Sequence, residues 1–177
     1  FIENDSETEG GTVTLKISEI EPNRTQPRKE FDEQALSELA ESISQHGLLQ
    51  PLLVRPLTLG GYQIVAGERR YRASRMAGLT EVPVIIKELT DTETMEIALI
   101  ENLQREDLSP VEEALGYKAL IDEHGFSQEE VAKSVGKSRP AVANALRLLK
   151  LPDNIMEYLK DGKISAGHAR ALLTLEN

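Results

Sequence analysis

The second half of the chain carries a repeated signal that fixes where its helices begin. In three places a Ser or Thr stands three residues before a Glu, which is the spacing of a capping box. The three pairs are Thr90 with Glu93, Ser109 with Glu112, and Ser127 with Glu130. Glycines stand where these helices should end, since a left-handed residue there closes the last turn. We therefore predict that the chain is helical throughout beyond residue 90.

The first half alternates between strand and helix patterns. Four short apolar runs predict strands, and a Gly-Gly turn joins two of them as a hairpin. These runs are TVTLKI (12–17), PLLVRPL (51–57), YQIVA (62–66) and VPVIIKEL (82–89). Asp32 is a suitable N-cap for a helix that runs to Gly47, and Gly67 precedes a helix that runs to Gly78. The order of strand, helix and strand indicates a mixed α/β domain.

These patterns predict an α+β chain with two domains. Residues 1–11 are polar and acidic, which is the composition of a disordered tail. Residues 12–108 should form the small α/β domain and residues 109–177 the helical domain, with a helix at 91–107 leading to the boundary. Because the sequence opens on Phe1, we expect it to be part of a longer chain.

Composition removes several classes of protein. The chain has no cysteine and three histidines, which excludes a disulfide framework, a thiolate metal site and a zinc cluster. No apolar run approaches the roughly 20 residues that span a bilayer, and the acidic first residues are unlike a signal peptide. We therefore expect a soluble, cytoplasmic protein without membrane contact.

The segment QEEVAKSVGKSRPAVANALRLLK (128–150) has the spacing of a helix-turn-helix. Gly136 permits a tight turn, and Ser138 caps the second helix. Residues 133–150 contain five basic residues and no acidic one, although acids outnumber bases 30 to 20 in the whole chain. Attraction to nucleic-acid phosphates is the favoured interpretation. An ordinary helical hairpin with a solvated basic face is the alternative.

In a DNA complex, the first turn of the second helix would enter the major groove. Arg139 would pair with guanine, Asn144 with adenine, and Ser138 with a phosphate or a base edge. The predicted DNA-binding residues are Lys133, Lys137, Ser138, Arg139, Asn144, Arg147, Lys150, Lys163 and Arg170. For Lys163, His168 and Arg170, contact with the DNA backbone and plain surface charge both stay open.

A second basic cluster lies in the first half, at AGERRYRASR (66–75). A glycine before a helix lets an anion approach the unpaired N–H groups of the first turn, where the helix dipole is positive. Arg69, Arg70 and Arg72 would repel one another without a counter-ion. Either a phosphate-like anion or several carboxylates must therefore lie among them, and the sequence alone leaves both open.

The segment IENLQRED (100–107) is the second candidate for an anion site. On a continuous helix Glu101, Gln104 and Arg105 share one face, and the simplest interpretation is an ion pair between Glu101 and Arg105, worth about 0.2 to 0.5 kcal/mol. In a nucleotide site, Glu101 and Asn102 would instead hold Mg²⁺ and Arg105 would neutralise phosphate charge.

Five motifs together resemble the ParB family of chromosome-partitioning proteins. They are TQPR (25–28), QHGLLQPLLVR (45–55), AGERRYRA (66–73), ALIENLQREDLSPVEEA (98–114) and GKSRPAVANALRLLKLP (136–152), in the family's order over residues 12–174. The resemblance implies a sulfiredoxin-like, nucleotide-binding α/β domain and a helix-turn-helix domain that binds the palindromic site parS. It also implies a C-terminal dimerisation domain that this sequence does not contain.

The resemblance implies a CTPase with Mg²⁺. Slow hydrolysis of CTP to CDP, stimulated by parS, would reopen a clamp that closes on DNA and slides along it. GERR would cradle the triphosphate and QHGLLQP would border the cytosine, and the catalytic residues would be Gln26 and Glu101. The metal ligands would be Glu101 and Asn102. The nucleotide-binding residues would be Thr25, Arg28, Gly47, Gln50, Gly67, Glu68, Arg69, Arg70, Asn102 and Arg105.

The implied partners are double-stranded parS DNA, a second copy of the chain, the ParA ATPase and SMC, in a nucleoid-associated protein. Among the alternatives, sulfiredoxin chemistry is excluded because it needs a cysteine where Glu68 stands. Relatives of this fold that phosphorylate free serine would not need residues 127–150. The nucleoid-occlusion paralogue Noc binds a different DNA site, and a nucleotide-regulated transcription factor would bind without spreading; both stay open.

Overall fold

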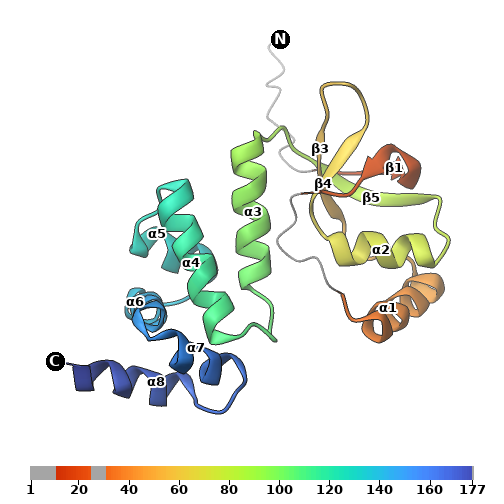
Figure 1. The fold of residues 1–177 in the computed structure, drawn as a ribbon. Coiled ribbons are helices and arrows are strands. Elements are labelled where there is room, and N and C mark those ends of the chain that lie inside the picture. The colour runs from red at the N-terminus through yellow and green to blue at the C-terminus, as the bar shows by residue number, and fades with distance from the viewer. Residues whose placement is uncertain (1–10, 25–30, 177) are drawn as a thin grey trace, which may run out of the picture. The chain divides into compact units, whose positions relative to one another are not determined.

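The computed structural model describes residues 11–24 and 31–176 and shows two compact units (Figure 1). The units are Phe1–Ala98 and Leu99–Asn177. Thr25, Gln26 and Arg28 lie outside the described residues, as does the predicted tail up to residue 10. Whether residue 108 limits an independently folding domain stays a prediction.

The first unit is built on a five-stranded sheet of mixed direction. The strands are β1 (Thr12–Lys16), β2 (Ile20–Glu21), β3 (Leu52–Pro56), β4 (Tyr62–Ala66) and β5 (Glu81–Ile86), with the short 3-10 turn η1 (Ile17–Glu19) before β2. Their order is β1-β5-β3-β4-β2. The β1–β5 and β3–β4 pairs are antiparallel, and the β3–β5 and β2–β4 pairs are parallel. The predicted hairpin is confirmed, with Gly60 and Gly61 at positive φ in its turn.

Two helices cover one face of this sheet, and α2 (Glu68–Met76) packs between the sheet and α1 (Glu33–His46) (Figure 1). Tyr71 on α2 belongs to the apolar cluster of the sheet, and its hydroxyl donates to the carbonyl of Ile20 at 3.1 Å. Ala73 on α2 is buried against the apolar stripe of α1. The predicted cap is also confirmed, since Asp32 accepts from the backbone N–H of Gln34 at 3.0 Å.

The division between the units falls within α3 (Asp91–Leu103). The second unit continues with α4 (Pro110–His124), α5 (Gln128–Val135), α6 (Arg139–Arg147), η2 (Leu148–Lys150), α7 (Asp153–Lys160), α8 (Ala166–Leu173) and η3 (Thr174–Glu176). Tyr117 and Leu120 of α4 form its main core with apolar residues of α5 and α6. The predicted fold class, a mixed α/β part followed by a helical part, is confirmed.

The predicted helix starts are confirmed, but the capping differs in detail. Only at Thr90 do both capping-box bonds form among the three predicted pairs: Glu93 N–H donates to Thr90 Oγ1 at 3.1 Å, and Thr90 N–H donates to Glu93 Oε1 at 3.2 Å. Ser109 and Ser127 accept from the third residue of their helices, as predicted. A further complete box, Ser165 with His168, was missed because histidine is not a usual residue of that motif.

The prediction of a helix at 91–107 was wrong at its end, because α3 stops at Leu103. The next two backbone bonds, from Gln104 to Glu101 and from Arg105 to Asn102, run over three residues rather than four. Such tight bonds are typical of a last helical turn. Gln104 and Arg105 therefore leave the helix, and they do not share a helical face with Glu101.

Candidate functional site

The start of α2 is shaped by Gly67. Its φ of 101° lies in the left-handed region, which favours glycine. A Cβ at this position would come within 2.8 Å of Leu52 Cδ2 and 3.0 Å of Arg70 Nη2. The backbone here can therefore turn sharply from β4 into α2 only without a side chain, and the N–H groups of the first turn follow directly.

Arg70 joins two of the sequence motifs. Its Nη1 donates to the backbone carbonyls of Gln50, at 3.0 Å, and Pro51, at 2.7 Å, just before β3. The GERR segment and the QHGLLQP segment are thereby brought together, although 20 residues separate Arg70 from Gln50. Gly47, at the C-terminus of α1, opens the second segment with a φ of 72°. Periodicity in the sequence gave no sign of this contact.

Glu68 is a buried carboxylate in the first turn of α2, and its side chain is only 3% exposed. Its Oε1 accepts from Arg72 Nε at 3.2 Å, while its buried Oε2 accepts no hydrogen bond within the described part of the chain. Burial raises the pKa of Glu68 above its ordinary value of 4.5, and the bond and charge of Arg72 oppose that shift. The Arg72 guanidinium also lies over the ring of Phe31, 4.3 Å from its centroid.

The three arginines of the cluster have different partners. Arg72 pairs with the carboxylate of Glu68, as the interpretation with carboxylates among the arginines predicted, and Arg70 donates to backbone carbonyls. Arg69 is exposed and forms no ion pair with the residues that the structure describes. A carboxylate therefore neutralises the charge of Arg72, whereas the charge of the exposed Arg69 stays available to an anion near the start of α2.

Arg105 does not pair with Glu101 as the simplest interpretation predicted. Having left the helix, it donates from Nη2 to Glu112 Oε2 at 2.8 Å, and its Nε lies 3.8 Å from Asp107 Oδ1. Asn102, still on α3, has a buried Oδ1 that accepts no hydrogen bond from the described residues. Amide and carboxylate oxygens suit Mg²⁺, so Asn102 and Glu101 fit the predicted ion if phosphates and water supply its other ligands.

The helix-turn-helix is present as predicted. Gly136 ends α5 in the left-handed region with a φ of 71°, and Ser138 caps α6 by accepting from Ala141 N–H at 3.2 Å. Val131 and Val142, both with no exposed area, pack the two helices together. The local sequence was sufficient here because the turn and the cap depend on near neighbours.

The predicted DNA-binding side chains lie on accessible parts of the second unit. Exposed are Lys133, Lys137, Ser138, Arg139, Arg147, Lys150 and Lys163, and half-buried are Asn144 and Arg170. None of the basic residues among them forms an ion pair with a described carboxylate. Lys163 lies over the ring of Tyr158 on α7, 5.4 Å from its centroid. Their positive charge is therefore not neutralised within this part of the protein.

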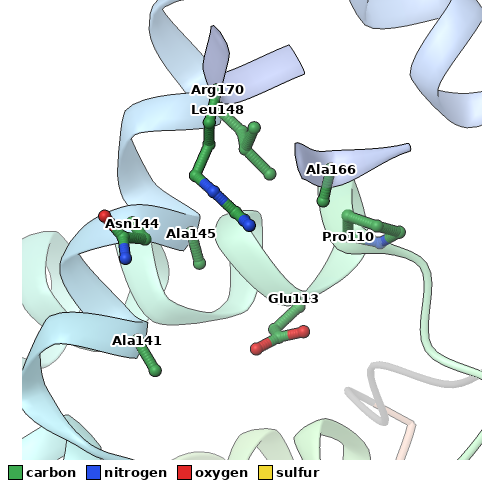
Figure 2. Close-up of a pocket in the computed structure, with 8 residues that line it drawn as sticks. All are labelled: Pro110, Glu113, Ala141, Asn144, Ala145, Leu148, Ala166 and Arg170. Carbon is green, nitrogen blue, oxygen red and sulfur yellow. The ribbon is translucent and has the colours of Figure 1, made fainter. Parts of the chain in front are cut away.

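A cavity of about 300 Å³ is lined by residues of α6, the second helix of the helix-turn-helix, and of α8. Figure 2 shows Arg170 from α8 reaching into it beside Asn144 from α6, with Glu113 from α4 on the other side. The sequence placed Arg170 on a later helix but could not bring it next to Asn144. Glu113, whose Oε1 accepts from the Tyr117 hydroxyl at 2.6 Å, was not predicted from the sequence. The pKa of Tyr117 is raised mainly by burial, and the hydrogen bond to Glu113 and its negative charge raise it further.

Both parts of the chain match known families. Residues 2–103 match the ParB N-terminal domain, and residues 106–177 match the ParB HTH domain. The chain belongs to the ParB family. Within the residues that the structure describes, no helix is both long and apolar enough to cross a membrane.

Individual ParB-family proteins agree with this assignment. The chain is 64% identical over 169 residues to the chromosome-partitioning protein Spo0J of Thermus thermophilus, covering 96% of this chain and 62% of that protein. It thus spans about three fifths of that relative's length.

The fold also resembles two solved structures of C-terminally truncated ParB from Caulobacter crescentus. The complex with the centromeric parS site has a TM-score of 0.84 and 48% identity, covering 91% of this chain and 84% of that chain. The complex with CTP-γ-S has a TM-score of 0.52 and 49% identity, covering 93% of each chain.

Proposed function

We propose that this chain is the nucleotide-binding and DNA-binding part of a chromosome-partitioning protein that binds palindromic parS DNA. The observation that carries the proposal is the acid-free stretch from Lys133 to Lys150, whose basic side chains are exposed and form no ion pair with a described carboxylate, in a fold that resembles a parS-bound ParB. DNA phosphates are the counter-ions that such a surface attracts. The first turn of α6, with Ser138 and Arg139, would read base edges.

We further propose that the protein binds CTP and hydrolyses it slowly to CDP. The phosphates would lie at the start of α2, where the first helical turn follows Gly67 and Arg69 supplies unneutralised charge. Arg70 would support the site by holding the segment from Gly47 to Gln50, which would border the cytosine. The likeness to a ParB that carries CTP-γ-S supports the choice of nucleotide.

The second unit would supply the metal ligands and a further cation. Glu101 and Asn102 would hold Mg²⁺, and Arg105 would contact phosphate. The ion, when bound, would neutralise phosphate charge. Enzymes accelerate phosphoryl transfer mainly by such charge neutralisation and by positioning the reacting groups. Thr25, Gln26 and Arg28 complete the proposed site, with Gln26 and Glu101 in the hydrolytic step.

The proposed cycle couples the two sites. CTP binding would close two copies of the chain on parS as a sliding clamp, and hydrolysis would reopen it. ParA and SMC are the partners proposed from the family, in a cytoplasmic, nucleoid-associated protein.

Nucleotide turnover tests the proposal. The full-length protein should hydrolyse CTP but not ATP, GTP or UTP, and parS DNA should accelerate the reaction where scrambled DNA does not. Binding to parS without any CTP turnover would contradict the proposed hydrolysis and favour a DNA-binding transcription regulator. A preference for a different palindrome would instead favour the nucleoid-occlusion paralogue.

A further inference from the structure

Arg105 is held by an acidic partner in the turn between α3 and α4. The guanidinium donates to Glu112 Oε2 at 2.8 Å, and the Arg105 side chain is only 20% exposed. Asp107 adds a second, looser carboxylate at 3.8 Å. The cation that the proposed function assigns to phosphate is therefore already engaged by negative charge.

The partner of Arg105 is fixed to the DNA-binding unit. Glu112 lies in the first turn of α4, where its backbone N–H donates to the capping Ser109 Oγ at 3.1 Å. Val111 and Ala114 in the first turns of the same helix are buried, and Tyr117 further along α4 belongs to the core shared with α5 and α6. Glu112 thus holds Arg105 from a helix that is packed into the core of the second unit.

The same turn leaves space beside Arg105. A cavity of about 410 Å³ is lined by Arg105, Glu106 and Glu113 from this region and by Gly136 and Lys137 from the turn of the helix-turn-helix. Arg105 Nε is buried and donates no hydrogen bond within the described residues. The guanidinium therefore has both an unfilled donor and room to change its partner.

A phosphate and the Glu112 carboxylate would compete for this guanidinium. Both are oxygen acceptors that prefer the same planar fork of N–H donors, and the two negative charges repel each other. We propose that Glu112 is a competing carboxylate that holds Arg105 in the nucleotide-free protein and that CTP must displace it. This proposal rests on the proposed function, in which Arg105 contacts the phosphates of CTP.

The consequence is a protein whose affinity for CTP is lowered by one of its own side chains. Loss of the Glu112 charge should therefore tighten CTP binding rather than weaken it. That direction is opposite to the one expected if the pair merely supports the fold, because loss of a supporting ion pair would loosen the site.

The test uses Glu112→Gln in the full-length protein. Glutamine keeps the length of the side chain and the helical backbone while it removes the charge. Glu106→Gln is the matched control, since Glu106 is exposed in the same turn, lines the same cavity and forms no ion pair within the described structure. Calorimetry with Mg²⁺ and CTP-γ-S should give a dissociation constant about 2- to 5-fold lower for Glu112→Gln, and a nearly unchanged one for Glu106→Gln.

A double variant separates this competition from a general effect of charge. In an Arg105→Ala background, Glu112→Gln should no longer change the dissociation constant. Equal affinities for Glu112→Gln and Glu106→Gln, or a gain that survives in the Arg105→Ala background, would overturn the inference. If the unaltered protein binds no CTP at all, the proposed function itself fails. Thermal unfolding of each variant shows that a lost affinity is not a lost fold.

Discussion

At the scale of single residues, two positions at the start of α2 are tightly constrained by the residues around them. Gly67 is needed because of its backbone angle and because Leu52 and Arg70 occupy the place of a side chain. Glu68 is a carboxylate removed from water beside a single arginine. Each predicts a different measurable effect on the stability of the protein.

Gly67→Ala should destabilise the protein by about 1 to 3 kcal/mol and weaken nucleotide binding, because the new methyl group meets Leu52 in a strained backbone conformation. Denaturant unfolding and CTP calorimetry measure the two effects. Gly78→Ala is the matched control: its φ is 77°, but a Cβ there has nothing within 4 Å. Equal losses in the two variants would show that the backbone angle alone matters.

Glu68 should make stability depend on pH. Its folded-state pKa is raised by burial, so between pH 4.5 and that raised value the folded chain keeps a proton that the unfolded chain has lost. Stability from this group is therefore present below pH 4.5 and falls as pH rises. Urea unfolding across pH 4.5 to 7.5 should show that Glu68→Gln gains stability relative to the unaltered protein as pH increases. A difference that is constant with pH would contradict this.

At the scale of secondary-structure elements, Arg55 of β3 ties the hairpin to the start of α3. Its guanidinium donates twice to Gln63 Oε1 on β4, at 2.7 and 2.9 Å, and to the carbonyl of Leu89 at 3.2 Å. It also pairs with Asp91 at 2.8 Å, although Asp91 is 96% exposed. The contacts with Gln63 and Leu89 are half-buried and should contribute most of the stabilisation.

Arg55→Ala should therefore cost about 2 to 3 kcal/mol of unfolding free energy, because it leaves the half-buried oxygens of Gln63 and Leu89 without their donor. Asp91→Asn removes only the exposed partner and should cost less than about 0.5 kcal/mol. Chemical denaturation of the two variants gives the comparison. A larger loss for Asp91→Asn would mean that the ion pair, and not the hydrogen bonds, holds α3.

The first turn of α6 makes a prediction about DNA. Arg139→Ala should reduce the preference for parS over scrambled DNA by about 1 to 3 kcal/mol, since a bidentate contact with guanine discriminates between bases. Lys150→Ala, at the end of the same basic stretch, should weaken binding to both DNAs alike. Fluorescence anisotropy with the two duplexes measures the ratio. An unchanged ratio for Arg139→Ala would show that this side chain does not read sequence.

The sequence was informative about elements wherever a signal is local. Caps at Asp32, Ser127 and Ser138 and the turn at Gly136 depend on residues a few positions apart, and these helices begin as predicted, although α6 ends at Arg147 and a 3-10 turn follows it. Strand β2 was missed because two residues are too short to show a period. The end of α3 was also missed, because Arg105 leaves the helix for Glu112, a partner that only the folded α4 brings close.

Side-chain neighbours that come from distant segments were equally beyond prediction. Arg70 reaches the carbonyls of Gln50 and Pro51, and Arg170 and Asn144 line the same cavity in Figure 2. Both arrangements depend on tertiary packing, which a single sequence does not reveal. The residue types in the candidate site were predictable, but their partners were not.

At the scale of the whole molecule, the proposed DNA affinity depends on salt. If the exposed lysines and arginines of the second unit contact phosphates, each contact should add about −0.9 to the slope of log affinity against log salt concentration. Lys133→Ala should therefore reduce the magnitude of that slope by about one. Lys118→Ala is the control, because Lys118 is paired with Asp122 at 2.8 Å and lies outside the proposed surface. A slope that Lys133→Ala leaves unchanged would remove Lys133 from the DNA contacts.

The separation of charge along the chain affects how the protein meets DNA before any specific bond forms. With a formal net charge of −10, most approaches to a duplex are repulsive, and the stretch from Lys133 to Lys150, free of acids, offers an attractive one. Electrostatic steering thus selects encounters that present α5 and α6 to the groove. Because the protein is oriented before it reaches the duplex, few collisions should be misaligned, and association should be fast even where non-specific affinity is low.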